Sequence, residues 1–510
     1  GGGTACTVTL APNTLSHTWI MRNETAAALT LTQGSGANVI IAAGQTKIVA
    51  TDGGGSGAVV YEMDDLELAG NLAVGGELST PSAGTSNTRI GVNAGNSIQS
   101  GGNYNVVVGD EAGTAITTGD QNTFFGYSAG LSVTTAVQNT LIGALAGDAL
   151  DTGGANIAVG YQALGADTKG GANVAIGNFA LDAQNFTTAT DSYNTAVGHA
   201  AGTAVTTGVL NTLIGGLAGD ALTSGNNNTA VGYLALSADT LGDRNTAIGN
   251  SALAAQNFTT TTDSYNTAVG FTAGASITTG VQNTLIGGLA GDAITDADAN
   301  VALGYLALSA NTVGSNSVAV GSAALQVQNP ATATDMYNVA VGHQAGKAVT
   351  TGVQNTLIGG LAGDALTDAD FNVAVGHTSL GSDTLGSKSV ALGGYTLANQ
   401  NFTTATDSLN VAVGHLAGYQ VTTGIKNTLL GALAGDSLTD ADNNVAIGYQ
   451  ALTTEDIGSR TVAIGYQTLF AQNSATATDT YNTAVGALAG AEVTTGTQNT
   501  IVGGLAADSL

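Results

Sequence analysis

The chain contains few of the residue types on which common protein chemistries depend. Its 510 residues include one cysteine, Cys6, three prolines and nine lysine or arginine residues. One cysteine excludes both an internal disulfide framework and a cysteine metal cluster. The nine basic residues face 36 acidic ones, a formal net charge of −27, so we expect no nucleic-acid partner and no polybasic membrane surface. No run of eighteen apolar residues occurs, so we expect no membrane insertion.

Glycine and small hydrophobic residues dominate what is present. The chain has 75 glycines and 43% hydrophobic residues, but only 9% charged ones. Such a chain is too apolar to be disordered, and it lacks the Gly-X-Y period of collagen. Threonine, asparagine, valine and isoleucine alternate with alanine and glycine, which favours short strands and tight turns. We therefore expect an all-β fold.

The sequence repeats itself. The segment NTLIGGLAGDAL occurs at 211–222 and again at 355–366. Its first five residues are one variant of a unit, N-[TV]-[AL]-[VIL]-G, that recurs 24 times between residues 87 and 510. Ser317, Ser389 and Thr461 replace the leading asparagine in three units. Successive spacings of 17, 17, 17 and 21 residues make a super-repeat of 72 residues, as shown by the units that begin at Asn194, Asn211, Asn228, Asn245 and Asn266.

A 17-residue unit is too short for a βαβ crossover or a propeller blade, but it fits one coil of a parallel β-solenoid, or β-roll. We expect two short strands per coil. The strand NTAVG places Thr and Val on one face and Asn and Ala on the other. Its glycine suits a sharp corner, and the segment TTG, as at 206–208, would end the second strand. Stacked asparagines would form a hydrogen-bonded ladder, and 24 coils would span roughly 115 Å.

The 21-residue coils carry four extra residues at a fixed place, in segments 182–194, 254–266, 326–338, 398–410 and 471–482. Insertions in a solenoid are expelled to one side as loops. The aromatic rings on these loops could stack on sugars or anchor a partner. The alternative is that each phenylalanine covers the solenoid edge or a neighbouring chain. The candidate binding residues are Phe186, Tyr193, Phe258, Tyr265, Tyr337, Phe402 and Tyr481.

Two groups of residues are candidate metal ligands. One histidine follows the first asparagine of a super-repeat by five residues in three places, at His199, His343 and His415. If three copies of the chain faced a common axis, each histidine could bind a metal together with the same histidine of the other copies. The alternative is a turn position that tolerates many residue types. The segments TDADAN, TDADFN and TDADNN begin like a calcium-binding loop but lack its glycine and distal glutamate, and the alternative is a polar turn. The aspartates concerned are Asp296, Asp298, Asp368, Asp370, Asp440 and Asp442.

The sequence contains no Walker motif and no H-E-x-x-H. Its G-x-S-x-G match, GYSAG at 126–130, falls within the glycine-rich repeat and is not followed by an expected helix, as a nucleophile elbow requires. The aspartate of the LAGD segments recurs along a rod, whereas a glycosidase needs two carboxylates in one cleft. We expect no enzyme activity and no cofactor.

The coil motif resembles the head repeats of YadA-like trimeric adhesins, N-[ST]-V-A-[IV]-G-x-x-A, most closely at 173–181 (NVAIGNFAL) and 228–236 (NTAVGYLAL). That family folds as a left-handed parallel β-roll in which three chains pack about one axis, so the resemblance implies a homotrimer. Residues 29–76 look like a module common in tail fibres of tailed phages, with QGSGANV followed by LELAGNLAVGG.

The two resemblances imply a structural and adhesive phage fibre in the virion tail. Its shaft would present an end that binds a host cell-surface receptor or glycan, with other tail or fibre proteins at both ends. A bacterial trimeric adhesin on the cell surface is the alternative. A polysaccharide-degrading tailspike and an ice-binding solenoid fit the regular repeat less well.

The domains that we expect are a small N-terminal β-rich domain (1–60), a connector that could be intertwined (61–86) and the β-roll shaft (87–510). Because a solenoid end normally needs a cap, we expect the natural chain to continue or another protein to cover its tip.

Overall fold

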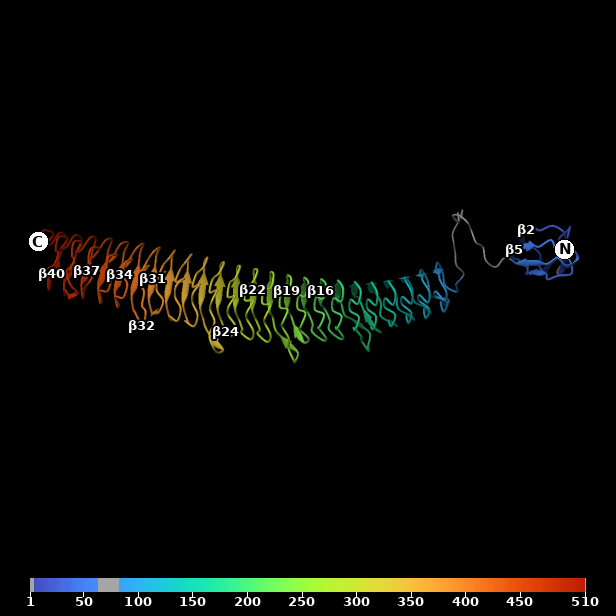
Figure 1. The fold of residues 1–510 in the computed structure, drawn as a ribbon, viewed down its shortest axis with the longest axis horizontal. Helices are drawn as coiled ribbons and strands as arrows, with labels where there is room; N and C mark the ends of the chain where they lie inside the picture. Colours follow the sequence, from blue (N-terminus) through green and yellow to red (C-terminus); the bar gives the residue numbers. More distant parts are fainter. Residues whose placement is uncertain (1–3, 63–81, 510) are drawn as a thin grey trace. The chain divides into compact units, whose positions relative to one another are not determined.

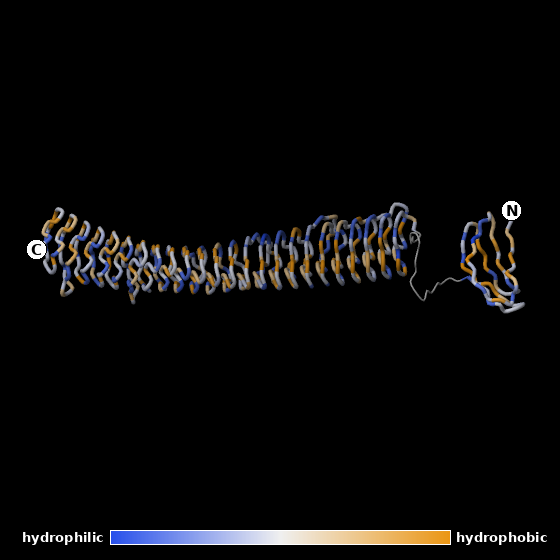
Figure 2. The backbone as a smooth tube through the Cα atoms, turned by 90° about the horizontal axis from the view of Figure 1, so that it is seen from above, coloured by the Kyte–Doolittle hydropathy of each residue, from blue (hydrophilic) through white to orange (hydrophobic). Residues whose placement is uncertain are grey.

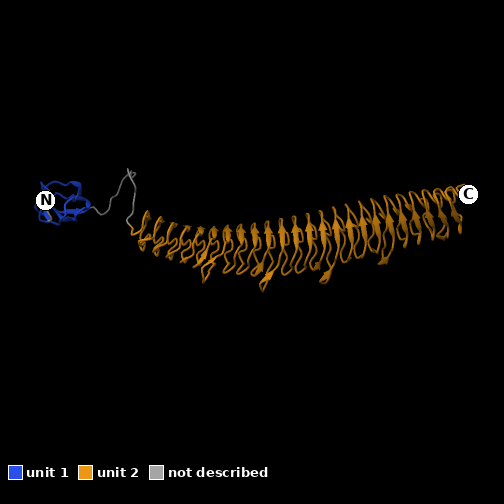
Figure 3. Ribbon diagram, turned by 180° about the vertical axis from the view of Figure 1, so that it is seen from behind, with its two compact units in different colours: residues 1–78 blue, residues 79–510 orange. Residues whose placement is uncertain are grey.

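The structure is a computed structural model that describes residues 4–62 and 82–509. The chain divides into two compact units, Gly1–Leu78 and Ser79–Leu510 (Figure 3). Most of the expected connector lies outside the described residues. The described parts contain no α-helix, and thus no helix long and apolar enough to cross a membrane.

The N-terminal unit is built from two three-stranded sheets, which agrees with the small β-domain expected there. One sheet has the order β1-β3-β4 and the other β2-β5-β6. Leu31, Val39, Ile41, Val49 and Val60 form its small buried core. The strands are β1 (Cys6–Thr9), β2 (Thr18–Arg22), β3 (Leu29–Thr32), β4 (Val39–Ile41), β5 (Thr46–Thr51) and β6 (Val60–Glu62), with the 3₁₀ turn η1 at Gly55–Gly57.

The second unit is a parallel β-solenoid, as the 17-residue spacing predicts (Figure 1). Each coil contributes one three-residue strand to a single parallel sheet, and consecutive coils pair in register, Leu213 beside Ala230 for example. The strands of this sheet are β7 (Thr88–Ile90), β8 (Val106–Val108), β9 (Thr123–Phe125), β10 (Thr140–Ile142), β11 (Ile157–Val159), β13 (Val174–Ile176), β15 (Thr195–Val197), β16 (Thr212–Ile214), β17 (Thr229–Val231), β19 (Thr246–Ile248), β21 (Thr267–Val269), β22 (Thr284–Ile286), β23 (Val301–Leu303), β25 (Val318–Val320), β27 (Val339–Val341), β28 (Thr356–Ile358), β29 (Val373–Val375), β31 (Val390–Leu392), β33 (Val411–Val413), β34 (Thr428–Leu430), β35 (Val445–Ile447), β37 (Val462–Ile464), β39 (Thr483–Val485) and β40 (Thr500–Val502).

The prediction of a second strand at TTG is wrong. Residues 206–207 form a bend, and the Thr206 hydroxyl donates to the carbonyl of Thr223 in the next coil, at 3.1 Å. Non-glycine residues with positive φ, such as Leu210 and Leu217, turn the chain so often that no longer strand fits. Only the inserted coils add a second pairing, through the two-residue strands β12 (Gly170–Gly171) with β14 (Thr190–Asp191), β18 (Gly242–Asp243) with β20 (Thr262–Asp263), β24 (Gly314–Ser315) with β26 (Thr334–Asp335), β30 (Gly386–Ser387) with β32 (Thr406–Asp407), and β36 (Gly458–Ser459) with β38 (Thr478–Asp479).

The predicted asparagine ladder is confirmed, and most of its bonds join a side chain to a backbone. The backbone N–H of Asn211 donates to Oδ1 of Asn194 at 2.9 Å. Oδ1 of Asn211 in turn accepts the N–H of Asn228 at 3.0 Å, while its Nδ2 donates to the carbonyl of Gly225 at 2.8 Å. All three asparagines are buried. Each amide therefore ties its coil to the next and satisfies backbone groups that have no contact with water.

The glycine that closes each strand permits close stacking. Gly215 has a φ of +134°, and a β-carbon placed on it would lie 2.4 Å from the carbonyl oxygen of Gly232 in the following coil. No side chain fits there, which confirms the sharp corner and close approach expected from the sequence.

The core lies inside each coil, and its packing explains the four-coil period. In the coil that starts at Asn211, the strand places Leu213 inside, and a β-carbon on Gly219 would lie 2.8 Å from that leucine. The following coil carries the pair reversed, with Ala230 in the strand and Leu236 at the turn, both fully buried. The coils before and after these two carry Ala196 with Gly202 and Ala247 with Leu253. The large side chains are thus distributed unevenly over four coils, and the dense interior is filled only over the whole set.

Candidate functional site: the exposed sheet face and the insertion loops

One of the two outward columns of the long sheet is apolar along its whole length. Central residues of the strands point into the coil, so the first and third residues point outwards. The third residue is Val, Ile, Leu or Phe in all 24 strands, and the first is Thr, Val or Ile. We call these two columns the sheet face. Hydrophobic segments recur coil after coil along the solenoid (Figure 2).

One edge of the sheet face carries exposed rings. The residue that follows the closing glycine of each strand is aromatic or histidine in 11 of the coils. Between most of these rings lies a small residue; the Tyr233 ring, for example, covers Gly216, where a β-carbon would be 3.5 Å from Cδ2. We call this column the ring edge, with Tyr127, Tyr161, His199, Tyr233, Phe271, Tyr305, His343, His377, His415, Tyr449 and Tyr466 as its rings.

The opposite edge has a different chemistry. It is formed by the residue that precedes each ladder residue, and it holds four of the nine basic residues of the chain. Several large apolar side chains are exposed beside them. We call this column the basic edge; its cations are Arg244, Lys388, Lys426 and Arg460, and its exposed apolar and aromatic members are Tyr104, Tyr193, Leu210, Tyr265, Tyr337, Phe371, Leu409 and Tyr481.

The four-residue insertions protrude on one side of the solenoid (Figure 1), as predicted. Phe186, Phe258 and Phe402 are only 7%, 5% and 5% exposed, which contradicts a binding role for them and agrees with the alternative that each covers the solenoid edge. The Phe402 ring packs against Gly386, where an added β-carbon would lie 2.7 Å from the ring. The rings therefore close the solenoid beneath each loop and leave no surface for a sugar. The tyrosines are exposed, as expected, and all four lie on the basic edge: Tyr193, Tyr265, Tyr337 and Tyr481.

A buried carboxylate holds the base of four of the five insertions. Oδ2 of Asp239 accepts Nε2 of Gln256 at 2.6 Å, and Oδ1 accepts the N–H groups of Gly242 and Phe258 at 3.0 and 3.5 Å. Gln256 then accepts Nδ2 of Asn266 at 2.9 Å. Burial raises the pKa of Asp239, and the hydrogen bond from Gln256 is the largest opposing effect. The equivalent buried residues are Asp167, Asp383 and Glu455, whereas the third insertion has Asn311.

Sequence reasoning missed this network. The sequence does carry a pattern that marks the network: in every inserted coil a glutamine follows an acidic or amide residue by 17 positions. Those positions fall in the buried column that carries Leu222 in the previous coil. The polar side chains interrupt an otherwise apolar core because the inserted loop brings unpaired backbone N–H groups that need acceptors.

A cation clamps the outer side of three insertions. Arg244 forms an ion pair with Asp263 and lies over the Tyr265 ring, 5.5 Å from its centroid. Arg460 makes the same contacts with Asp479 and Tyr481, and Lys388 pairs with Asp407. In the third insertion Asn316 donates to Asp335 at 2.8 Å. The first insertion has Ala172 at this place, beside Asp191.

Substituting Ala172→Arg should therefore stabilise the first insertion. We expect slower hydrogen exchange of amides 188–192, equivalent to roughly 0.3–1 kcal/mol, since a half-exposed ion pair and cation–π contact each contribute little. Hydrogen exchange with mass spectrometry measures this effect. Ala172→Gln is the matched neutral control, and equal protection in both variants would contradict a role for the charge.

The structure does not assemble the candidate calcium site. Oδ1 of Asp298 accepts the N–H of Val281 in the preceding coil at 2.8 Å, and Asp370 and Asp442 make equivalent bonds. Their neighbours Asp296, Asp368 and Asp440 accept threonine hydroxyls. The three pairs are four coils apart, and within 4–62 and 82–509 no group of three His, Cys, Asp or Glu residues could hold a metal. Asp298, Asp370, Asp442 and Asp368 thus act as acceptors between coils, whereas Asp296 and Asp440 accept from the threonine that precedes them.

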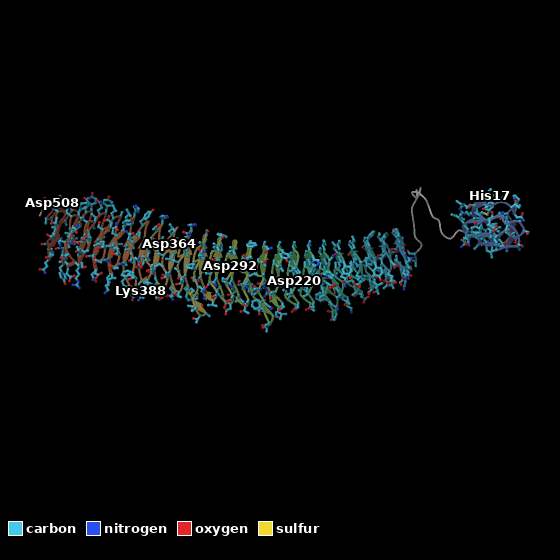
Figure 4. All side chains as sticks on the ribbon, in the orientation of Figure 1. His17, Asp220, Asp292, Asp364, Lys388 and Asp508 are labelled. Atoms are coloured by element: carbon cyan, nitrogen blue, oxygen red, sulfur yellow. The ribbon has the colours of Figure 1, made fainter. Side chains whose placement is uncertain are left out.

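The three candidate histidines lie apart from one another. His199, His343 and His415 are exposed on the ring edge, in coils four apart. Asp220, Asp292 and Asp364, the aspartates of LAGD segments, follow one another along the solenoid (Figure 4). Burial raises the pKa of each of these three carboxyls, as it does at Asp148, Asp182 and Asp436.

Comparisons with known proteins give no match: no protein-family model, curated protein or solved structure is significantly similar to this chain.

Proposed function

We propose that the solenoid is the shaft of a homotrimeric fibre whose copies associate along the sheet face. The carrying observation is that the third-residue column of this face is apolar in all 24 strands, beside a first-residue column of Thr, Val or Ile, although the coil interior already contains a complete core. An uninterrupted apolar strip of this length is far larger than the patches that monomeric proteins expose. At about 115 Å by 10 Å it offers roughly 1,000 Å² per copy, more than a stable interface needs.

The likeness to adhesin head repeats supports three copies about one axis, and the N-terminal likeness at 29–76 supports a phage tail fibre in the virion. In this proposal other fibre proteins join the ends, and a host receptor or glycan is the eventual target. The role is structural and adhesive, without catalysis. A bacterial surface adhesin is the second candidate; the same sheet face supports it, but the N-terminal segment favours the fibre.

Lysines introduced into the sheet face should separate the copies. We expect the unmodified chain to have a mass near three times 49.7 kDa by light scattering coupled to size exclusion. The variant Ile214→Lys/Ile286→Lys/Ile358→Lys should show a single-chain mass, because association would bury nine unpaired charges.

The control carries the same charges on another side of the coil, at the exposed positions Thr207→Lys, Thr279→Lys and Thr351→Lys. It should keep the mass of the unmodified chain. A single-chain mass for the unmodified protein would overturn the proposed association.

A further inference from the structure

We infer that three of the insertion loops are acceptor sites for N-linked sugars, at Asn185, Asn257 and Asn401. The inference goes beyond the proposed fibre and does not depend on association of the copies. It assigns to these loops a covalent modification whose co-substrate is a sugar activated by a phosphate group at its anomeric carbon.

The three asparagines begin the same triplet. Asn-Phe-Thr occurs at 185–187, 257–259 and 401–403, and Asn-x-Ser/Thr with any residue but proline at x is the acceptor motif for N-linked glycosylation. In each triplet the asparagine and the threonine are exposed and the phenylalanine is buried. The triplets lie in the loops that protrude from the solenoid (Figure 1). They are not part of the sheet face or of either of its edges.

Hydrogen bonds fix the acceptor amide and leave its nitrogen free. Oδ1 of Asn185 accepts the Thr168 hydroxyl of the preceding coil at 3.0 Å, and the backbone N–H of Asn185 donates to the Thr206 carbonyl of the next coil at 3.0 Å. In none of the three loops does Nδ2 donate a hydrogen bond within residues 4–62 and 82–509. A sugar replaces one hydrogen of Nδ2, so the bond at Oδ1 is kept. The equivalent bonds join Asn257 to Thr240 at 2.9 Å and Asn401 to Thr384 at 3.0 Å.

The fold does not require the threonine of the triplet. Its hydroxyl forms no hydrogen bond to any described residue in the three loops, and the third and fifth insertions form their loops with Ala331 and Ala475 in its place. The asparagine, in contrast, is present in all five insertions. Folding thus accounts for the asparagine but not for the threonine, which is the residue that completes the acceptor motif.

Two further triplets of this form are poor acceptors in the folded chain. In the triplet 23–25, Asn23 is 1% exposed and its Nδ2 donates to two backbone carbonyls, both at 2.8 Å. The triplet 227–229 runs into β17, and its middle residue Asn228 is buried in the asparagine ladder. The structure therefore selects three of the five acceptor triplets in the chain.

Transfer to Asn185 forms a bond between Nδ2 and the anomeric carbon of the sugar. The bond from that carbon to the phosphate oxygen breaks, the phosphate leaves with the electron pair, and the amide nitrogen loses one proton. Two classes of donor carry this chemistry, a nucleotide-linked hexose and a lipid-linked oligosaccharide. Both give the same linkage at the asparagine and differ in the mass that they add.

Glycosylation of the purified full chain tests the assignment. The folded protein is incubated with a soluble asparagine glucosyltransferase and UDP-glucose, and separately with a membrane oligosaccharyltransferase and a lipid-linked oligosaccharide. Each enzyme is first shown to modify a free peptide of residues 182–190. We expect peptide mass spectrometry to find one added sugar group at each of the three loops in at least one reaction, and none at Asn23 or Asn227. The added mass identifies the donor class.

Two results of these reactions would overturn the inference. One is a folded protein that neither enzyme modifies at any of the three loops, although both modify the peptide. The other is modification of Asn23 or Asn227 to the same extent as the loops. A single-chain mass for the unmodified protein would instead overturn the proposed fibre and leave the acceptor sites intact.

A triple variant separates the motif from the loop. Thr187→Ala/Thr259→Ala/Thr403→Ala should lose all three sugars. It should keep the unfolding midpoint of the unmodified chain, because alanine already occupies this place in two of the natural loops. Sugars retained in this variant would show that exposure of the asparagine, and not the triplet, determines modification.

The other two insertions provide a matched gain of the motif. Ala475→Thr completes a triplet and should add a sugar at Asn473, which is exposed. Ala331→Thr should add none at Asn329, because Pro330 stands at the middle position of that triplet. Equal modification of Asn329 and Asn473 in these variants would contradict recognition of the triplet.

Discussion

Replacing Asn211 by alanine should destabilise the solenoid by about 2–5 kcal/mol, since two buried backbone groups lose their partners. The N–H of Asn228 loses its acceptor, and the carbonyl of Gly225 loses its donor. Neither group can reach water, because the ladder is fully buried. The expected result is a lower unfolding midpoint in calorimetry and faster hydrogen exchange in β16 and β17.

Serine at the same position is the informative control. The chain itself uses Ser317 and Ser389 in the ladder, but only in inserted coils, where Gln328 or Gln400 bonds to the hydroxyl. Asn211 has no such glutamine in its coil, which carries Leu222 there. We therefore expect Asn211→Ser to be nearly as harmful as Asn211→Ala. Full stability of Asn211→Ser would show that the amide bonds described here contribute little.

Leucine in place of Gly219 should also be strongly destabilising, by about 1–3 kcal/mol or more through overpacking. Its β-carbon would lie 2.8 Å from Leu213 and 2.9 Å from Leu222. Positive φ is not the main obstacle, since Leu236 occupies the equivalent position of the next coil with a φ of +53°. Chemical denaturation followed by circular dichroism gives the change in unfolding free energy.

A compensating substitution separates overlap from backbone strain. Leu213→Ala alone should cost about 2–5 kcal/mol through the cavity that it leaves. Combined with Gly219→Leu, it gives the coil the Ala–Leu pair seen at Ala230 and Leu236. We expect the double variant to be more stable than the sum of the two single effects allows. Strict additivity would contradict the exchange of large side chains between coils.

Much of the solenoid could be predicted from the spacing of asparagine and glycine. The amide of Asn211 and the corner at Gly215 are local requirements of a coil that stacks on its copies, so each leaves a periodic mark in the sequence. The alternation in NTAVG likewise gives the inside and outside of every strand, because the side-chain period of a strand is two residues.

The two wrong predictions, a binding role for the loop phenylalanines and a strand at TTG, concern residues whose position depends on neighbouring coils. Phe186 looks like a loop residue in the sequence, yet its N–H donates to the buried Asp167 of the coil before it, and its ring is drawn inside. The TTG segment contains good strand formers, but the chain bends at 206–207, and both the N–H and the hydroxyl of Thr206 donate to the Thr223 carbonyl of the next coil. Neither the burial nor the turn is visible within a single 17-residue unit.

The 72-residue period of the core also sets the step in which the rod can change its length. Deletion of residues 194–265 would join Tyr193 to Asn266 and recreate the same DSYNTAVG junction, shortening the rod by about 19 Å, with Ile277 in the place of the buried Val205. Loss of the single coil 211–227 would instead remove Leu213, which fills the space beside Gly202. Recombination between repeated segments of the gene can therefore change the length of the rod by whole super-repeats while the pattern of the core is preserved.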